Sequence, residues 1–359
     1  MSTKPGASQG LRVGLAGAGW AAHYHLESWA RLAGRAHVVA IADPNVAAGR
    51  SRAAAFRVPA VYESVEAMLA AGGLDVIDVA AAREAHAPIC RQAARHRLSI
   101  LCQKPLAPTL AEAEALVADL GSIDTEGRGR EAGSGAGMPL RGSVRLMVHE
   151  NWRFRPHYRQ IARWLREGRA GTVRTVTMSL LTSGLLPDAR GALPALVRQP
   201  MLATLDRLLL MEVLIHLVDT LRFLLGPLSL AGARLGHSCP AVRGEDRASL
   251  FLTSAGGAAV SLVGDFMAHG HPAEQFDRLE ILGTRGAITL EADRLRLRGD
   301  SEEDLTIDLQ ANYRASYAAA IAHFVDRLAD GGPFETSPED NLETLRIVEA
   351  AYAAGRREA

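Results

Sequence analysis

The first 120 residues alternate short apolar runs with longer stretches in which apolar positions recur at helical spacing. Short runs rich in Val, Ile and Leu predict buried strands, and the helical spacing predicts amphipathic helices. The predicted strands are 11–17, 37–43, 75–81 and 98–103, with a short extended piece at 58–62 and a closing strand at 143–152; the predicted helices are 21–32, 45–56, 64–71, 86–96 and 109–120. This repeated strand–helix order is typical of a parallel, doubly wound sheet.

The second half of the chain shows strand patterns joined by hairpin-like turns, such as GTRG at 283–286. The predicted strands are 174–182, 248–254, 258–266, 277–284, 287–292 and 295–298; the predicted helices are 156–168, 205–225, 314–330 and 338–355. Between the halves, residues 121–142 are rich in Gly, Ser and charge and are interpreted as a mobile loop or insertion. The pattern therefore predicts an α/β protein with a Rossmann-type domain at 10–150 and, at 151–359, an α+β domain with an open, mainly antiparallel sheet.

Composition narrows the range of functions. A chain of 359 residues is long enough for roughly two domains. Its 40 basic and 40 acidic residues balance, so the charge gives no reason to expect nucleic acid or an acidic membrane as a partner. The most apolar window, 205–225, holds several charged residues, and the polar start does not resemble a signal peptide. Three cysteines without metal-site spacing favour a reduced, cytoplasmic setting.

The clearest motif is GAGWAA at residues 17–22, which lies between a predicted strand and a predicted helix. In a dinucleotide site Gly17 would make the tight turn, Gly19 would let the backbone approach the pyrophosphate, and Ala22 would allow close packing, with Trp20 and Ala21 opening the helix. The alternative is that the motif forms a glycine turn with a purely structural role. Asp43 ends the next strand, where a carboxylate binds ribose hydroxyls, so we expect NAD, with NADP possible.

A second feature is MEVLIHLVDTLRFLLG at 211–226, an apolar helical run that contains Glu212, His216 and Asp219. On a continuous α-helix these three positions lie within about 40° of one another. Burying such groups is unfavourable unless they pair or take part in chemistry. The residues alone leave three interpretations: a metal site, a catalytic acid–base pair or a salt-bridged core helix. The helix offers few ligands, and with no Cys or His cluster to add others we expect no metal.

Several motifs occur in one order along the chain: His25 after the glycine motif, DVIDVAAAREAH at 75–86, CQKPLA at 102–107, HENWRFRP at 149–156 and EVLIHLVDTLRFLLGP at 212–227. In this order they resemble the glucose–fructose oxidoreductase, inositol dehydrogenase and rhizopine-catabolism family, Gfo/Idh/MocA. The resemblance spans nearly the whole chain. It implies a Rossmann domain followed by a domain with an open antiparallel sheet, and NAD(P)-dependent dehydrogenases of sugars and cyclitols that form dimers or tetramers.

The resemblance also assigns roles. It implies that His216 accepts the substrate proton, that Glu212 supports it and that Lys104 polarises the substrate oxygen, while Ala81, His86 and Gln103 lie beside the cofactor. Asn151, Trp152 and Arg153 are expected to border the substrate or nicotinamide, and Asp219 and His25 to be structural. The chain departs from the family pattern at three positions: Gln103 replaces Glu, Glu212 replaces Asp, and Ala82 replaces the Pro four residues before His86.

The sequence therefore predicts a cytoplasmic NAD(P)-dependent oxidoreductase that transfers a hydride between the nicotinamide and a secondary alcohol of a sugar, sugar acid or cyclitol. Its expected partner is a small polyol or sugar, with neither nucleic acid nor a membrane. Because an antiparallel sheet with one uncovered face favours a partner, we expect a homodimer or homotetramer. Two alternatives remain: an NAD-dependent glycosidase or lyase that oxidises its substrate transiently, and a non-catalytic dinucleotide-binding regulator.

Overall fold

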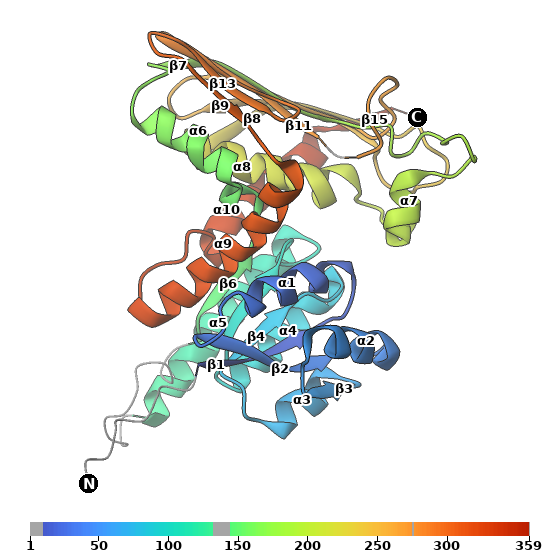
Figure 1. Cartoon of the computed structure of the whole chain (residues 1–359), viewed down its shortest axis with the longest axis vertical. Coiled ribbons are helices and arrows are strands. Elements are labelled where there is room, and N and C mark those ends of the chain that lie inside the picture. Colours follow the sequence, from blue (N-terminus) through green and yellow to red (C-terminus); the bar gives the residue numbers. More distant parts are fainter. Residues whose placement is uncertain (1–9, 132–143, 275, 359) are drawn as a thin grey trace. The chain divides into compact units, whose positions relative to one another are not determined.

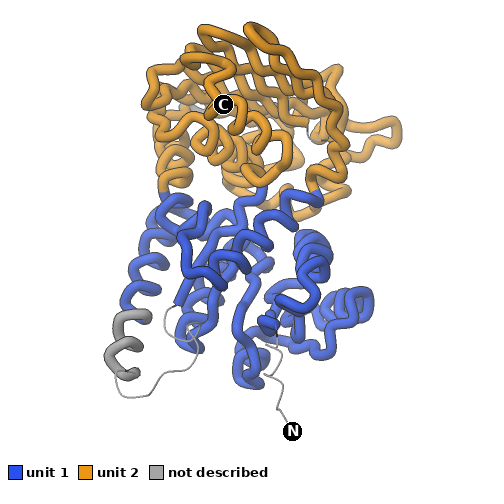
Figure 2. The backbone as a smooth tube through the Cα atoms, turned by 60° about the vertical axis from the view of Figure 1, so that its left-hand side comes forward, with its two compact units in different colours: residues 1–151, 314–342 blue, residues 152–313, 343–359 orange. Residues whose placement is uncertain are grey.

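The computed structural model describes residues 10–131, 144–274 and 276–358. The chain forms two compact units (Figure 2). Unit 1 contains the residues up to Asn151 together with Arg314–Leu342, and unit 2 contains Trp152–Tyr313 together with Glu343–Ala359. The first change of unit falls beside the predicted boundary at residue 150. The later return of Arg314–Leu342 to unit 1 has no counterpart in the sequence pattern.

Unit 1 is built on a parallel six-stranded sheet in the order β3-β2-β1-β4-β5-β6. Its strands are β1 (Leu11–Ala16), β2 (Ala36–Ala42), β3 (Ala60–Tyr62), β4 (Val76–Val79), β5 (Ser99–Gln103) and β6 (Leu146–His149). All four residues of β4 and of β6 are buried, as expected for strands covered on both faces. The predicted doubly wound sheet is confirmed.

The strands of unit 1 alternate with helices α1 (Trp20–Ala30), α2 (Val46–Phe56), α3 (Val65–Ala71), α4 (Arg83–Arg95) and α5 (Leu110–Glu131), which are drawn around the sheet in Figure 1. Local chemistry fixes two helix starts. The Asn45 side chain accepts the amide of Ala48, and Ser64 accepts that of Ala67, so each satisfies a first-turn N–H. Side chains of α1 and β2 pack into one core, which includes Leu15, Leu26 and Ile41.

Unit 2 is built on a nine-stranded sheet in the order β14-β13-β12-β11-β7-β10-β9-β8-β15. Its strands are β7 (Val173–Leu181), β8 (Leu228–Gly236), β9 (Arg247–Ser254), β10 (Ala259–Asp265), β11 (Asp277–Gly283), β12 (Gly286–Glu291), β13 (Arg294–Gly299), β14 (Glu303–Thr306) and β15 (Arg356–Glu358). Neighbours pair antiparallel except β7 with β10 and β8 with β15. The predicted, mainly antiparallel sheet is confirmed.

One face of this sheet is buried and the other is open. Val176, Met178 and Leu180 of β7 are buried, and the residues between them are more exposed. In Figure 1 the helices α6 (Pro156–Arg166) and α8 (Ile215–Leu225) run along one side of the sheet. The remaining elements of unit 2 are η1 (Trp152–Phe154), α7 (Pro194–Arg198), η2 (Pro200–Thr204) and the π-helical turn η3 (Leu210–Leu214). Helices α9 (Leu309–Asp330) and α10 (Pro338–Ala354) each contribute residues to both units.

The structure corrects three predictions. Residues 121–131, interpreted as part of a loop or insertion, continue α5 as a helix, and residues 132–143 lie outside the described part of the chain. The predicted helix at 205–225 is wrong over residues 205–208, which are not helical; the rest contains a π-helical turn at Leu210–Leu214 followed by α8 from Ile215, because a hydrophobic pattern reports burial and not the hydrogen-bond step. Strands β8, β14 and β15 were missed. In β8 most residues are partly buried or exposed, and the two buried residues are adjacent, so alternation is weak.

Candidate active site

The glycine motif joins β1 to α1, as the sequence predicts. Gly17 has φ +104°, and a Cβ there would lie 2.5 Å from the carbonyl oxygen of Ala80. Only glycine therefore fits this turn. At Gly19 an added Cβ would meet nothing within 4 Å, and no side chain caps the helix that follows. Gly19 is thus not required by the protein's own packing, and the loop leaves room at the helix N-terminus where a pyrophosphate would bind.

Asp43 is tied to this loop. Its Oδ2 accepts the Ala18 amide at 2.6 Å, and its Oδ1 accepts the Asn45 amide at 2.7 Å. Arg52, which the sequence analysis did not select, donates from α2 to the carbonyl oxygens of Ala18 and Gly19 at 3.3 and 3.1 Å. Arg52 therefore braces the carbonyls of the loop, while Asp43 braces an amide. These contacts fit a preorganised nucleotide loop.

Two further predicted residues follow the carboxyl ends of neighbouring parallel strands. Ala81 follows β4, and Lys104 follows β5 and precedes Pro105 through a cis peptide bond. His86, buried in α4, lies between them, with Nδ1 2.7 Å from the Pro105 carbonyl oxygen and Nε2 3.1 Å from that of Ala81. In open parallel sheets this edge is where ligands bind. His86 thus ties together the two strand ends that the sequence assigns to the cofactor.

Gln103 lies at the last position of β5. Its Oε1 accepts the Lys104 amide at 2.8 Å, and its Nε2 lies 3.3 Å from Nε2 of His25. His25 is fully buried, and its Nδ1 lies 2.8 Å from Asp78 Oδ2, which also accepts the Trp29 indole N–H at 2.7 Å. The expected structural role of His25 agrees with this burial. Asp78 was missed, although a carboxylate inside the apolar run DVIDVAA was a usable signal.

In unit 2 the His216 ring stacks on the Trp152 indole, with centroids 4.8 Å apart and planes 4° from parallel. The Arg155 guanidinium lies 3.6 Å from the centroid of the same indole. All three residues are buried, with His216 8% exposed. The indole therefore fixes the plane of the imidazole, and the guanidinium holds the indole through a cation–π contact. This support was not predicted, because stacking between segments far apart in sequence leaves no local pattern.

Arg155 also forms part of a buried cluster around Asp277. Its Nη1 lies 3.0 Å from Asp277 Oδ1, and the Tyr158 hydroxyl donates to Oδ2 of the same carboxylate. Burial alone would raise the pKa of Asp277, but the Arg155 charge and the hydrogen bonds outweigh it and hold that pKa well below its usual range. For Tyr158, burial together with the nearby carboxylate raises the pKa. The cluster is an ionised, hydrogen-bonded anchor for the Trp152–Arg155 stack.

The three polar residues predicted to share one side of a helix, Glu212, His216 and Asp219, lie in different environments. Glu212 is half-buried in the π-helical turn, and His216 and Asp219 lie in α8. Asp219 is 1% exposed and accepts hydrogen bonds from two Arg153 guanidinium nitrogens, Nε and Nη2, with Nε to Oδ2 at 2.7 Å. The expected structural role of Asp219 agrees with this buried ion pair. Arg153, predicted beside the substrate, is engaged in this buried pair, and Asn151 donates to the Ser316 hydroxyl at 2.7 Å.

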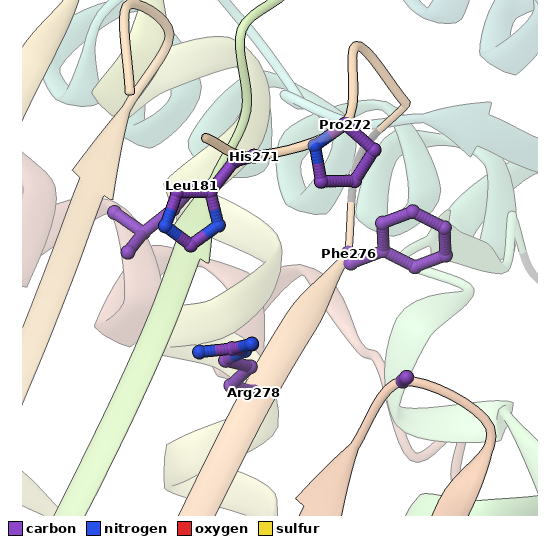
Figure 3. A pocket seen from close by; sticks show the side chains of 6 residues that line it. Leu181, His271, Pro272, Phe276 and Arg278 are labelled. Atoms are coloured by element: carbon purple, nitrogen blue, oxygen red, sulfur yellow. The ribbon is translucent and has the colours of Figure 1, made fainter. Parts of the chain in front are cut away.

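Within residues 10–131, 144–274 and 276–358, no group of three or more His, Cys, Asp or Glu side chains is placed to hold a metal ion. None of the helices described there combines the length and apolar character needed to cross a membrane. A pocket of about 150 Å³ in unit 2, lined by Leu181, His271, Pro272, Phe276, Arg278 and Ala292, involves none of the predicted site residues (Figure 3).

Comparison with known proteins agrees with the two-unit architecture. Residues 11–122 match the model of an oxidoreductase family with an NAD-binding Rossmann fold, and residues 158–289 match the Gfo/Idh/MocA C-terminal domain. A D-apiose dehydrogenase of Paraburkholderia graminis is 32% identical over 95% of this chain and 87% of its own length. The chain belongs to the Gfo/Idh/MocA family. The resemblance inferred from the motifs is therefore confirmed, and the protein is an NAD(P)-dependent oxidoreductase with NAD as its cofactor.

Other members of the family are similar over comparable lengths. An inositol 2-dehydrogenase of Rhizobium meliloti is 26% identical and aligns over 95% of this chain and 96% of its own. An oxidoreductase of Agrobacterium radiobacter, solved in complex with NAD+, L-tartaric acid and magnesium, has a TM-score of 0.83 and 27% identity, with 96% of each chain covered. These Gfo/Idh/MocA proteins share both domains with the chain described here.

Proposed function

We propose that this Gfo/Idh/MocA enzyme oxidises a secondary alcohol of a sugar, sugar acid or cyclitol with NAD. The support is twofold: relatives that align with nearly the whole chain are named for apiose and inositol, and Asp43 directly follows β2, where a carboxylate favours unphosphorylated ribose. When bound, NAD accepts the hydride at its nicotinamide. Gly17, Gly19, Trp20, Ala21, Ala22, Asp43, Ala81, His86, Gln103 and Lys104 are the residues proposed to hold it.

His216 is proposed to take the proton of the substrate hydroxyl, since a neutral imidazole accepts protons near physiological pH. Glu212 would support that transfer. Trp152 stacks on the imidazole and is positioned to restrict its orientation. The immobilised ring is the observation in unit 2 that carries this assignment, because general-base catalysis depends on a fixed geometry.

Lys104 is proposed to hold the substrate oxygen and to stabilise the charge that develops on it. The presence of a lysine at this position supports this role. Among the chain's 40 Lys and Arg residues, only Lys4 and Lys104 are lysines. Everywhere else within the described ranges the chain uses the planar guanidinium, but at this strand end it has a compact ammonium, which can donate to a single oxygen.

The first experiment is a fluorescence titration with NADH and, separately, NADPH, followed by absorbance assays on D-apiose, myo-inositol, L-tartrate and levoglucosan. We expect tighter NADH binding and reduced-cofactor formation with at least one polyol or sugar acid. Lys104→Ala and His216→Ala should each lower kcat at least about 100-fold. Full activity in both variants would refute the assigned roles. Substrate conversion without net NADH would instead favour the transient-oxidation alternative.

The open face of the unit 2 sheet carries the second part of the proposal, a homodimer or homotetramer. Phe251 and Leu282 are 57% and 39% exposed. They lie on strands β9 and β11 of this sheet, at positions that alternate with its buried residues. Light scattering of wild type and Phe251→Asp tests whether the protein forms this homodimer or homotetramer. A wild type that is monomeric at all concentrations would exclude the oligomer.

The free, buried cysteines Cys90, Cys102 and Cys239 support a reducing, cytoplasmic location.

A further inference from the structure

A line of polar groups in successive contact leads from the Lys104 backbone to buried residues of unit 1. Lys104 donates its backbone N–H to Gln103 Oε1 at 2.8 Å, and Gln103 Nε2 lies 3.3 Å from His25 Nε2. His25 Nδ1 lies 2.8 Å from Asp78 Oδ2, which accepts the Trp29 N–H at 2.7 Å. Asp78 and His25 are fully buried. The groups come from β5, α1 and β4, so the line links three elements to one backbone amide.

The protons along this line can be assigned from the donor at its end. A backbone N–H can only donate, so the Gln103 oxygen must face Lys104 and its NH2 group must face His25. His25 Nε2 must therefore be an unprotonated acceptor. The single ring proton then lies on Nδ1 and is donated to Asp78. Every contact is satisfied only when His25 is neutral and in this one tautomer.

We propose that His25 and Asp78 are positioning residues for Lys104, acting through the orientation of the Gln103 amide. The proposal rests on the role proposed for Lys104. Protonation of His25 would place an N–H against the Gln103 NH2 group. The amide would then turn over or withdraw, and it would lose its bond to the Lys104 backbone. The ammonium at the strand end is thus held in place by a histidine that must stay neutral.

The surroundings of His25 include further titratable and aromatic groups. The His149 ring of β6 lies 4.4 Å from the His25 ring, and that of Tyr317 of α9 lies 5.5 Å away, measured between centroids. Asp78 is the carboxylate in contact with the imidazole. Its Oδ1 is buried and has no hydrogen-bond partner in the part of the chain that the structure describes. The carboxylate therefore relies on the donors at Oδ2.

Gln103→Glu is the decisive variant. One carboxylate oxygen can still accept the Lys104 amide, but the other now faces His25 Nε2. A proton must lie between them, so His25 should become doubly protonated. We expect the variant's kcat/KM to fall about tenfold per pH unit once that proton is lost on the alkaline side, where wild type stays level. Gln310→Glu, the same change at an exposed position, should keep the wild-type profile.

A second readout does not depend on turnover. With ¹⁵N-labelled histidine, NMR of wild type at neutral pH should show His25 with a proton on Nδ1 alone, whereas Gln103→Glu should show both nitrogens protonated. His25→Asn identifies the signal. A wild-type proton on Nε2, or identical pH profiles for Gln103→Glu and Gln310→Glu, would overturn the proposal. Full activity of Lys104→Ala would instead refute the proposed function itself.

Discussion

The buried Arg153–Asp219 pair gives a sharp test of how unit 2 is held together. The two side chains are 5% and 1% exposed, and Asp219 also accepts the Thr344 hydroxyl at 3.2 Å. Asp219→Ala would leave the Arg153 guanidinium buried without its carboxylate. Removing one partner of a buried pair costs about 3–5 kcal/mol of the free energy of unfolding, because the remaining charge is uncompensated.

The matched control is Asp300→Ala. Asp300 pairs with Arg285, and the two side chains are 60% and 61% exposed. An exposed pair of this kind contributes about 0–1 kcal/mol. Replacing both members of the buried pair, as Arg153→Met with Asp219→Leu, should recover most of the loss, because neither charge then has to be desolvated.

The assay is urea unfolding followed by both circular dichroism and tryptophan fluorescence, so that separate unfolding of the two units is detected. A loss for Asp219→Ala no larger than that for Asp300→Ala would refute the reasoning. Equal destabilisation by the single and double variants would also refute it, because packing and not charge would then explain the loss.

Three further predictions concern the nucleotide loop, acid stability and the catalytic imidazole. Gly17→Ala should lower both the melting temperature and NADH affinity. Gly19→Ala should weaken NADH binding at least tenfold and leave the melting temperature unchanged. Normal NADH binding by Gly19→Ala would exclude a pyrophosphate beside Gly19. The folded-state pKa of Asp277 is lowered, so its stabilising effect is fully present above the unfolded value of about 3.9 and is lost progressively as pH falls from there through the folded value. Asp277→Asn should therefore destabilise the protein at neutral pH, and the difference in urea midpoint from wild type should begin to narrow as pH falls below about 3.9; a constant difference would contradict this. Trp152→Leu should lower kcat about 10–100-fold with little change in substrate KM, because the His216 ring loses its stacking partner. A change confined to KM would indicate that Trp152 contacts the substrate instead.

The sequence alone determined the features that depend on local pattern. Alternating apolar runs predicted the parallel sheet of unit 1, and the glycine motif with Asp43 predicted the nucleotide loop, because a tight turn and a helix start are encoded by adjacent residues. Motif order also indicated Lys104, Gln103 and His216. The local pattern gave a wrong prediction at 205–225. Glu212 lies in a π-helical turn and therefore does not follow the α-helical spacing of His216 and Asp219 in α8.

Only the tertiary structure decided which polar groups meet. His25 and Asp78 are far apart in sequence, as are Trp152 and His216, yet each pair is in direct contact. A buried charge is tolerated only when folding brings a partner to it, and the identity of that partner is set by sheet order and helix packing and not by any local motif. For the same reason the structure engages Arg153 with Asp219, although its position in the sequence suggested a substrate contact.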